Sequence, residues 1–415
     1  MGTPGPRYFG KPHEAQPARL KEIIDLQWGQ IGKSIHLIAS ACYPFQSVLH
    51  AMASPAFVFP AEGMPGSRYL PGASSMDLIE TEGEALVSRL FGWPAGYRAT
   101  LQPHSGTQAN QIAFNAVLKQ DDKVLCLKAR DGGHISHTVL IGRRHETANY
   151  GLTNDGRVDY DSMRDLARKV RPKLIVVGGS ALPREIDFTL CGEIARESGA
   201  YLHADISHTA TFIAAGLHAS TFPACDFISF NTVKNLRGPN AGILLYRDTL
   251  RAETEAAIFP TTQGGANETG MIGKFAALLE WQNRDIRTYA DSIVHLSRAM
   301  ASSLTAAGVD LVTGGTDCHI LLMDLSNDSR TGAELELEFE RHGVLLNRNL
   351  VPHDKRGPAA TSGLRVGVTN LAILGYSVPD ATALAQWMVG VIEGKSVDND
   401  LIRSLQAKYR WNLDQ

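Results

Sequence analysis

Short apolar runs alternate with helical stretches through the middle of the chain, and this alternation constrains the fold most. KVLCL (123–127), KLIVVGG (173–179), YLHADIS (201–207) and CDFISF (225–230) are such runs, and a helical pattern covers 187–198. Buried strands separated by helices predict a parallel sheet with helices on both faces. Ligands of such sheets bind beyond the carboxyl ends of the strands. The polar residues there are therefore the first candidates for a site: Ser180, Asp205, His208 and Lys234.

The remainder of the chain predicts a second, smaller unit. After a helical stretch at 270–304, the elements become VDLVTGG (309–315), HILLMDL (319–325), a helix near 332–342, GVLLNRN (343–349), GLRVGV (363–368) and a final helix near 378–393. These indicate a small α/β layer with a mostly antiparallel sheet. A chain of 415 residues is too long for one ordinary core. We predict an N-terminal arm and helix (1–45), a large domain (46–275) and a small C-terminal domain (276–415).

Composition excludes several classes of protein. The charged share is 20%, the apolar share 44% and the net charge −3, which gives no reason to expect nucleic acid as a partner. No run of about 18 apolar residues is present, so no membrane association is expected. The five cysteines are scattered without metal-ligand spacing, which predicts reduced thiols, a cytoplasmic location and no metal site.

Three local patterns carry chemistry. PHSGTQAN (103–110) places Ser105, Gly106 and Thr107 in a turn that opens a helix, where an anion such as phosphate binds; an ordinary helix cap would use the same residues. Asp205 ends a buried strand and needs a cationic partner, either a pyridinium nitrogen or an arginine. Lys234 ends the next apolar run. A lysine near an anion site and a buried aspartate is what a Schiff-base cofactor, pyridoxal phosphate, requires.

With these motifs in hand, the chain resembles serine hydroxymethyltransferase over about residues 35–390. The resemblance is carried by LIAS, AEGMPGSRY, QPHSGTQAN, DGGHISH, HADISHTATFIAAGLH, TVKNLRGPNAG, FPTTQGG, VTGGTDCHILLMDL and TSGLRVG. It implies the fold of fold-type I pyridoxal phosphate enzymes: a large, aspartate aminotransferase-like domain with a mostly parallel seven-stranded sheet, and a smaller C-terminal α/β domain. It also implies a homodimer or a dimer of dimers.

The resemblance assigns roles at the cofactor. Lys234 would bind the cofactor aldehyde, Asp205 the pyridine nitrogen, and His134 would stack on the ring. His208 and Ser180 would contact the ring or its substituent. The phosphate would be bound by Ser105, Gly106 and Thr107, together with Gly264 and Gly265 from across a dimer interface.

The resemblance also assigns roles at the substrate. Arg365 would pair with the α-carboxylate, which Ser40 would also contact. Glu62 would be the acid/base carboxyl supplied by the neighbouring subunit, and Tyr69 the remaining tyrosine of a family Arg-Tyr-Tyr motif.

Departures from the family pattern bear on the reaction. Pro60, Leu70, Asn231, Val233 and Asn240 stand where the family has other residues. Ala129 and Ala359 replace larger apolar residues expected around a folate, while Leu125 is retained there. We therefore predict a folate-independent, threonine transaldolase-like enzyme: retro-aldol cleavage of threonine or serine, then addition of the glycyl carbanion to another aldehyde.

Two alternatives stay open. One is a tetrahydrofolate-dependent serine, or α-methylserine, hydroxymethyltransferase. The other is a catalytically inactive binding protein on the same fold.

Overall fold

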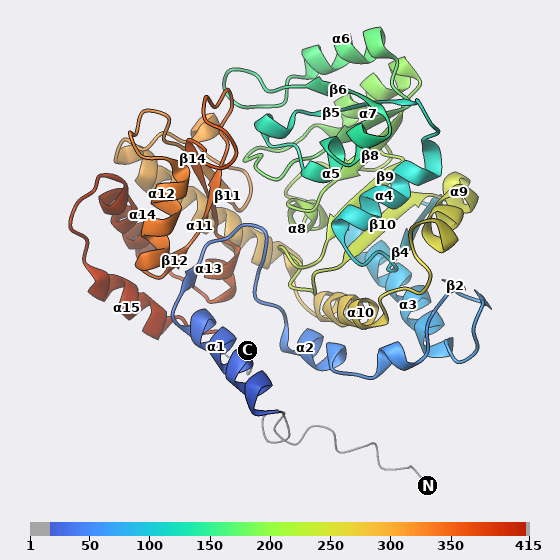
Figure 1. Cartoon of the computed structure of the whole chain (residues 1–415), viewed down its shortest axis with the longest axis horizontal. Helices are drawn as coiled ribbons and strands as arrows, with labels where there is room; N and C mark the ends of the chain where they lie inside the picture. The colour runs from blue at the N-terminus through green and yellow to red at the C-terminus, as the bar shows by residue number, and fades with distance from the viewer. Residues whose placement is uncertain (1–16, 412–415) are drawn as a thin grey trace.

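The computed structural model describes residues 17–411, and Figure 1 shows the arrangement of its elements. The predicted arm at residues 1–16 lies outside these residues. The largest sheet has seven strands in the order β4-β10-β9-β8-β7-β5-β6. All of them run in the same direction except β10, which is antiparallel to both of its neighbours. The strands are β4 (Tyr97–Thr100), β5 (Lys123–Leu127), β6 (Glu146–Tyr150), β7 (Leu174–Val177), β8 (Tyr201–Asp205), β9 (Phe227–Asn231) and β10 (Gly242–Arg247). The predicted mostly parallel α/β sheet is confirmed.

Helices cover both faces of this sheet because alternate strand residues point to opposite sides. In β5, Leu125 and Leu127 belong to one core cluster, whereas Val124 and Cys126 belong to another. The first cluster packs against α3 (Ser74–Phe91), α6 (Tyr160–Val170), α7 (Phe188–Ser198) and α10 (Glu268–Gln282), and the second against α4 (Gly106–Val117). All four central strands β5, β7, β8 and β9 therefore read as nearly continuous apolar runs.

The C-terminal part contains a second sheet with its own core. Its three strands lie in the order β11-β14-β13 and are antiparallel, as predicted. They are β11 (Ile320–Asp324), β13 (Asn347–Asn349) and β14 (Gly363–Gly367). Around them lie α11 (Ile286–Ala306), α12 (Gly332–Arg341), α13 (Thr369–Ile373), α14 (Val378–Ile392) and α15 (Asn399–Lys408). The predicted domain boundaries at 45 and 275 stay a prediction.

Two predicted C-terminal strands differ from the structure. VDLVTGG forms no strand, because Leu311 makes a single bridge to Met323 before a 3-10 turn in which Thr313 has a φ of 67°. GVLLNRN divides into two strands, since β12 (Val344–Leu345) pairs with β1 (Ile35–His36) and only β13 joins the three-stranded sheet. An N-terminal segment thus lies against the C-terminal unit.

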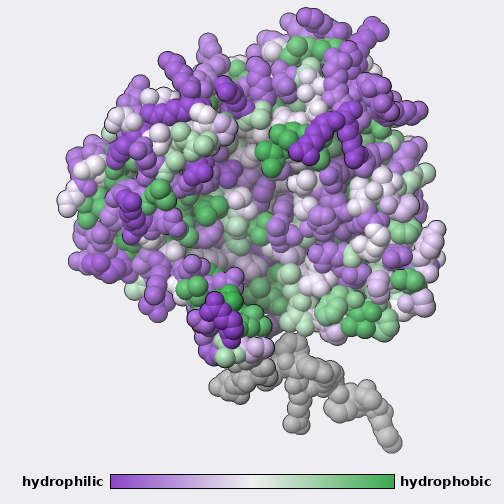
Figure 2. Space-filling model, viewed as in Figure 1, coloured by the Kyte–Doolittle hydropathy of each residue, from purple (hydrophilic) through white to green (hydrophobic). Residues whose placement is uncertain are grey.

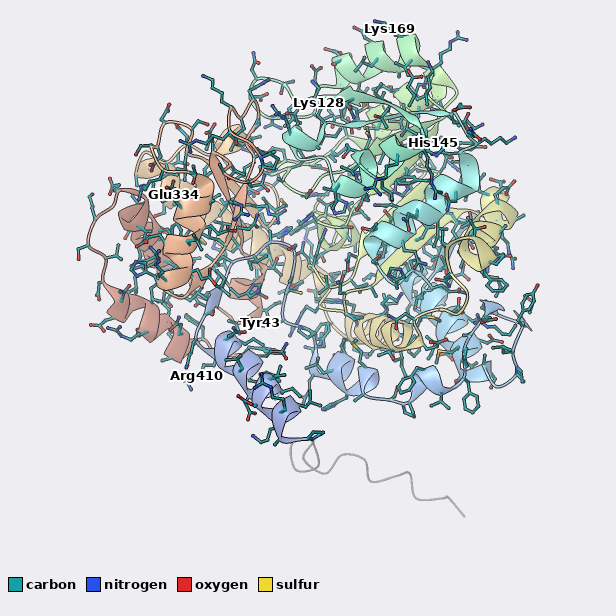
Figure 3. All side chains as sticks on the ribbon, viewed as in Figure 1. Tyr43, Lys128, His145, Lys169, Glu334 and Arg410 are labelled. Atoms are coloured by element: carbon teal, nitrogen blue, oxygen red, sulfur yellow. The ribbon has the colours of Figure 1, made fainter. Side chains whose placement is uncertain are left out.

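The two described ends of the chain also meet. Trp28 of α1 (Ala18–Gly32) stacks on Trp411 at 5.4 Å between ring centroids, and Trp411 stacks on Tyr43 at 4.9 Å. Figure 3 labels Tyr43 and Arg410 at this junction. The remaining short elements are α2 (Gln46–Met52), β2 (Gly63–Met64), β3 (Ser67–Arg68), α5 (Ile135–Thr138), α8 (Ala210–Ala214) and α9 (Arg251–Ala256). Within residues 17–411, no helix combines the length and apolar character needed to cross a membrane.

Candidate active site

A cavity of about 590 Å³ lies at the carboxyl end of the large sheet, and most of the predicted site residues line it. Those residues are Ser40, Ser105, Gly106, Thr107, His134, Ser180, Asp205, His208, Lys234 and Arg365. The sheet positions five of them: Ser105 follows β4, His134 follows β5, Ser180 follows β7, Asp205 ends β8 and Lys234 follows β9. The strands share one direction, so their carboxyl ends gather these side chains at one edge of the sheet.

Lys234 presents an amine without a hydrogen-bond partner among the described residues. Burial lowers the pKa of this amine to about 8, although the carboxylate of Asp205 acts in the opposite direction. An amine with a lowered pKa is neutral in a larger fraction near neutral pH and is a better nucleophile. Lys234 is therefore available to react with an aldehyde.

Asp205 is held as an anion. Its Oδ2 accepts a hydrogen bond from Asn110 at 2.8 Å and lies 3.0 Å from His137 Nε2, and its Oδ1 accepts from the Ser207 N–H at 3.0 Å. Burial alone would raise the pKa of the carboxyl, but these bonds and the nearby Lys234 charge hold it well below its usual range. A carboxylate fixed in this way can bind a protonated ring nitrogen.

His134 gives the cavity a neutral ring in its wall. Its Nδ1 lies 2.6 Å from Ser136 Oγ and also accepts from the Ser136 N–H, so the ring orientation is set at the start of α5. Burial lowers its pKa to about 4. A neutral aromatic ring suits stacking on a flat cofactor.

The segment Ser105–Thr107 forms an anion loop at the start of α4. Ser105 is the helix cap, because its Oγ accepts the Gln108 N–H at 3.1 Å. Gly106 and Thr107 are the first helical residues, and the N–H groups of a first turn have no partner inside the helix. A helix cap and an anion site are therefore compatible at these residues. Ser105 caps the helix, and the first turn of α4 still faces the cavity.

Arg365 is a buried guanidinium without a carboxylate partner among the described residues. It lies on β14, and its side chain donates to the Ser180 carbonyl at 2.5 Å and to Asn347 Oδ1 at 3.1 Å. Burial lowers its pKa to about 10, which leaves it charged at neutral pH. A buried cation with only neutral acceptors favours an anionic ligand.

His208 lines the cavity and contacts a second buried histidine, His319. Its Nδ1 is 3.3 Å from His319 Nε2, the two rings stack, and burial lowers the pKa of both. His319 Nε2 is in turn 3.1 Å from the Ala39 carbonyl, next to Ser40. The pair links β11 to the Ser40 segment at the cavity wall.

Asn231, Val233 and Asn240 also line the cavity. Asn231 Oδ1 accepts the Val233 N–H at 3.2 Å, and its Nδ2 donates to Asn240 Oδ1 at 2.9 Å. These three departures from the family pattern therefore form one connected patch of the wall. Leu125, in contrast, is fully buried in the core of β5, so its predicted place beside a folate is wrong.

Glu62, Tyr69, Gly264 and Gly265 are not among the residues that line the cavity. They cluster elsewhere: Glu62 forms a β-bridge with Gly265, and the Tyr69 N–H donates to the Glu62 carbonyl at 3.1 Å. Tyr69 is 74% exposed. Beside this cluster, Phe57, Val58 and Phe59 are exposed as well, and Figure 2 shows apolar side chains gathered near α2 at the lower edge of the view.

Several residues that fix the site escaped the sequence analysis: Asn110, His137, Ser207, His319 and Asn347. Four of them lie in quoted motifs: Asn110 in PHSGTQAN, His137 in DGGHISH, Ser207 in HADISHTATFIAAGLH and His319 in VTGGTDCHILLMDL. Except for Ser207, their partners lie on distant segments of the chain, so only the fold shows what they bind. His134, His137 and Asp205 could also offer ligand atoms to a metal, but two of these atoms already face each other in the Asp205 contact.

The cavity fits pyridoxal phosphate. Lys234 supplies an unpartnered amine for the aldehyde, Asp205 an ionised acceptor for the ring nitrogen, and Ser105–Thr107 a helix start for the phosphate. His134 supplies a ring for stacking. Each functional group of the cofactor thus has a counterpart in the wall.

Comparisons with known proteins agree with this fit. A family model described as serine hydroxymethyltransferase matches residues 14–388. Serine hydroxymethyltransferase of Acidiphilium cryptum (strain JF-5) is 36% identical over 399 residues, which cover 95% of this chain and 92% of that protein. The enzyme of that name from Halorhodospira halophila is 37% identical over 386 residues (92% and 91%), and that from Methanospirillum hungatei 37% over 406 residues (95% and 97%).

Proposed function

The chain belongs to the serine hydroxymethyltransferase family of pyridoxal phosphate-dependent transferases, and from this premise we propose that it transfers the hydroxymethyl carbon of serine to tetrahydrofolate. The relatives that carry this name cover almost the whole chain. The observation that carries the proposal is one cavity that holds both the Lys234 amine, which has no hydrogen-bond partner within residues 17–411, and the Arg365 guanidinium, which has no carboxylate partner there. An amino-acid substrate needs both.

The bound cofactor supplies an electron sink that stabilises a carbanion at the substrate α-carbon. Arg365 binds the α-carboxylate, in a bidentate geometry that guanidinium favours. The contacts of Arg365 with Ser180 and Asn347 fix the direction of its side chain. Ser40, which also lines the cavity, contributes a hydroxyl. The substrate is thereby oriented before any bond changes.

Proton positions follow from the same residues. Asp205 remains ionised and holds a proton on the ring nitrogen of the cofactor, which keeps the ring electron-poor. Lys234, with its pKa near 8, can accept and return a proton near neutral pH. Glu62 supplies the acid/base carboxyl for the substrate hydroxyl.

A dimer completes the site in this proposal. Glu62, Gly264 and Gly265 lie outside the cavity of their own chain, beside the exposed Phe57–Phe59 stretch. If this surface packs on a second copy, these residues enter the partner's site. A cytoplasmic location is consistent with the five cysteines, all of which are buried and unpaired.

The test is serine cleavage with and without tetrahydrofolate. We expect glycine to form from serine at a high rate only when tetrahydrofolate is present, and Lys234→Ala to abolish the reaction without unfolding the chain. Folate-independent turnover at the same rate contradicts the main proposal.

A second candidate is the folate-independent aldol transfer from threonine or serine to another aldehyde. The connected patch of Asn231, Val233 and Asn240 favours it, because these side chains shape the wall near the reacting lysine. L-Threonine and an acceptor aldehyde, incubated with the protein without folate, should then release acetaldehyde. No acetaldehyde, together with folate-dependent serine cleavage, excludes this candidate.

A further inference from the structure

Three hydrogen-bonded glutamine side chains, here called the glutamine chain, connect the anion loop to the segment that carries Glu62; Gln102 and Gln108 are buried and Gln263 is half-buried. Gln108 Nε2 donates to Gln263 Oε1 at 2.9 Å, and Gln263 Nε2 donates to Gln102 Oε1 at 2.7 Å. Gln102 Nε2 then donates to the Gly63 carbonyl at 3.0 Å. Every side-chain amide in the glutamine chain accepts one hydrogen bond and donates another. The bonds therefore run in one direction, from α4 to β2.

At one end of the glutamine chain, Gln108 fixes the anion loop. Gln108 Oε1 accepts the His104 N–H at 2.6 Å, and the Gln108 N–H donates to Ser105 Oγ. The Gln108 side chain is 1% exposed, so water cannot replace these partners. A shift of the loop upon phosphate binding therefore moves the Gln108 amide with it.

The other end holds the segment Ala61–Gly63. Arg68 donates to the carbonyls of Ala61 at 3.2 Å and Gly63 at 2.5 Å, and it is paired with the buried Glu80. Gln102 Nε2 also donates to Glu80 at 3.0 Å, which joins the glutamine chain to this ion pair.

Gln263, the middle residue of the glutamine chain, is next to the glycine pair Gly264–Gly265. Gln263 directly precedes Gly264 and Gly265, and Gly265 forms the β-bridge with Glu62. The glutamine chain thus contacts two segments: Gln102 bonds to Gly63, next to Glu62, and Gln263 is next to Gly264. The proposed function assigns Glu62, Gly264 and Gly265 to the partner's site.

We infer that Gln102 and Gln263 are positioning residues that couple the two active sites of the dimer. Cofactor phosphate bound at the anion loop of one subunit orders the Gln108 amide, and the glutamine chain passes this order to Glu62, Gly264 and Gly265. Because the dimer lends those residues to the second site, the second cofactor binds more tightly than the first. The inference rests on the proposed function, which places these three residues across the interface.

The test is a titration of the full-length apoprotein with pyridoxal phosphate, followed by the visible absorption of the bound cofactor. For the natural chain we expect the second site to bind about fivefold or more tightly than the first. Gln263→Leu should make the two sites equal, because it removes both the acceptor for Gln108 and the donor for Gln102. Gln406→Leu is the matched control: Gln406 donates to the Lys33 carbonyl at 2.8 Å, away from the cavity, and its loss should leave the coupling unchanged.

A conservative variant separates coupling from folding. Gln263→Glu keeps the shape and the acceptor for Gln108 but cannot donate to Gln102 Oε1 as a carboxylate, so coupling should be lost in a folded protein. Sedimentation velocity identifies the oligomer in each sample. A dimer whose sites are equal in the natural chain, or remain coupled in folded Gln263 variants, overturns the inference alone. A fully active monomer overturns both the shared site and the inference.

Discussion

His137 Nε2 lies 3.0 Å from Oδ2 of Asp205, at the carboxyl end of β8. With Asn110 on the same oxygen and the Ser207 N–H on the other, the contact leaves Asp205 fixed and ionised beside the cavity. The carboxylate is the part of the site that most directly sets the electronic state of a bound pyridine ring.

Replacing Asp205 should therefore damage chemistry more than folding. Asp205→Asn preserves the shape but removes the charge that holds the ring nitrogen protonated. We expect kcat to fall roughly 10²- to 10⁴-fold, which corresponds to about 3–5 kcal/mol of lost transition-state stabilisation. Steady-state serine cleavage measures this. Asp324→Asn, at the end of β11, is the control and should retain activity. Unchanged kcat in Asp205→Asn contradicts the assignment.

Cofactor uptake by the apoprotein should depend on pH through Lys234. Burial lowers the pKa of its amine to about 8, and only the neutral amine attacks an aldehyde. The rate should rise roughly tenfold per pH unit below that pKa and level off above it. Stopped-flow absorbance over that range measures the profile. Because Asp205 raises the Lys234 pKa, Asp205→Asn should move the plateau to lower pH; a flat wild-type profile would contradict this role for Lys234.

Arg365→Lys should weaken substrate use while leaving cofactor uptake nearly unchanged. Lysine keeps the charge but loses the two-pronged geometry and the bond to Asn347. Losing a charged hydrogen bond costs about 1.5–3 kcal/mol, or roughly 10- to 150-fold in kcat/KM, mainly through KM. Arg348→Lys, whose partner Glu336 lies on the surface, should behave as wild type. An equal loss in both variants would show that Arg365 does not bind substrate.

Lys274 should be a structural hydrogen-bond donor behind the anion loop, since burial lowers the pKa of its amine to about 7. It is fully buried, and its Nζ donates to the carbonyls of Leu101, Pro103 and Gly242. Lys274→Met leaves these acceptors short of a donor and should cost about 1–3 kcal/mol in the free energy of unfolding. Urea unfolding of the apoprotein measures the loss, against Lys395→Met at an exposed ion pair, which should change stability by less than about 0.5 kcal/mol. Equal stabilities would contradict this role.

The central strands could be predicted from the sequence because their apolar runs report burial on both faces. β5 begins and ends where the run KVLCL does. The edge strands β4 and β6 were missed, since YRAT and ETANY mix polar and apolar residues as strands with one free edge can. The internal strand β10 was also missed, although GILLYR is an apolar run. The helical stretch at 270–304 is divided into α10 and α11, with Asn267 and Asp285 as separate caps.

By itself, the sequence determined the cofactor chemistry, because an aspartate and a lysine each lie at the end of a recognisable apolar run and a Ser-Gly-Thr turn opens a helix. Only the tertiary structure decided which side chains complete the site. Arg365 meets Ser180, and His137 meets Asp205, across separations along the chain that no local pattern encodes. It also placed Glu62 and Gly265 together, away from the cavity of their own chain. The physical reason is that strand order and sheet packing, which are non-local, bring these backbone positions together.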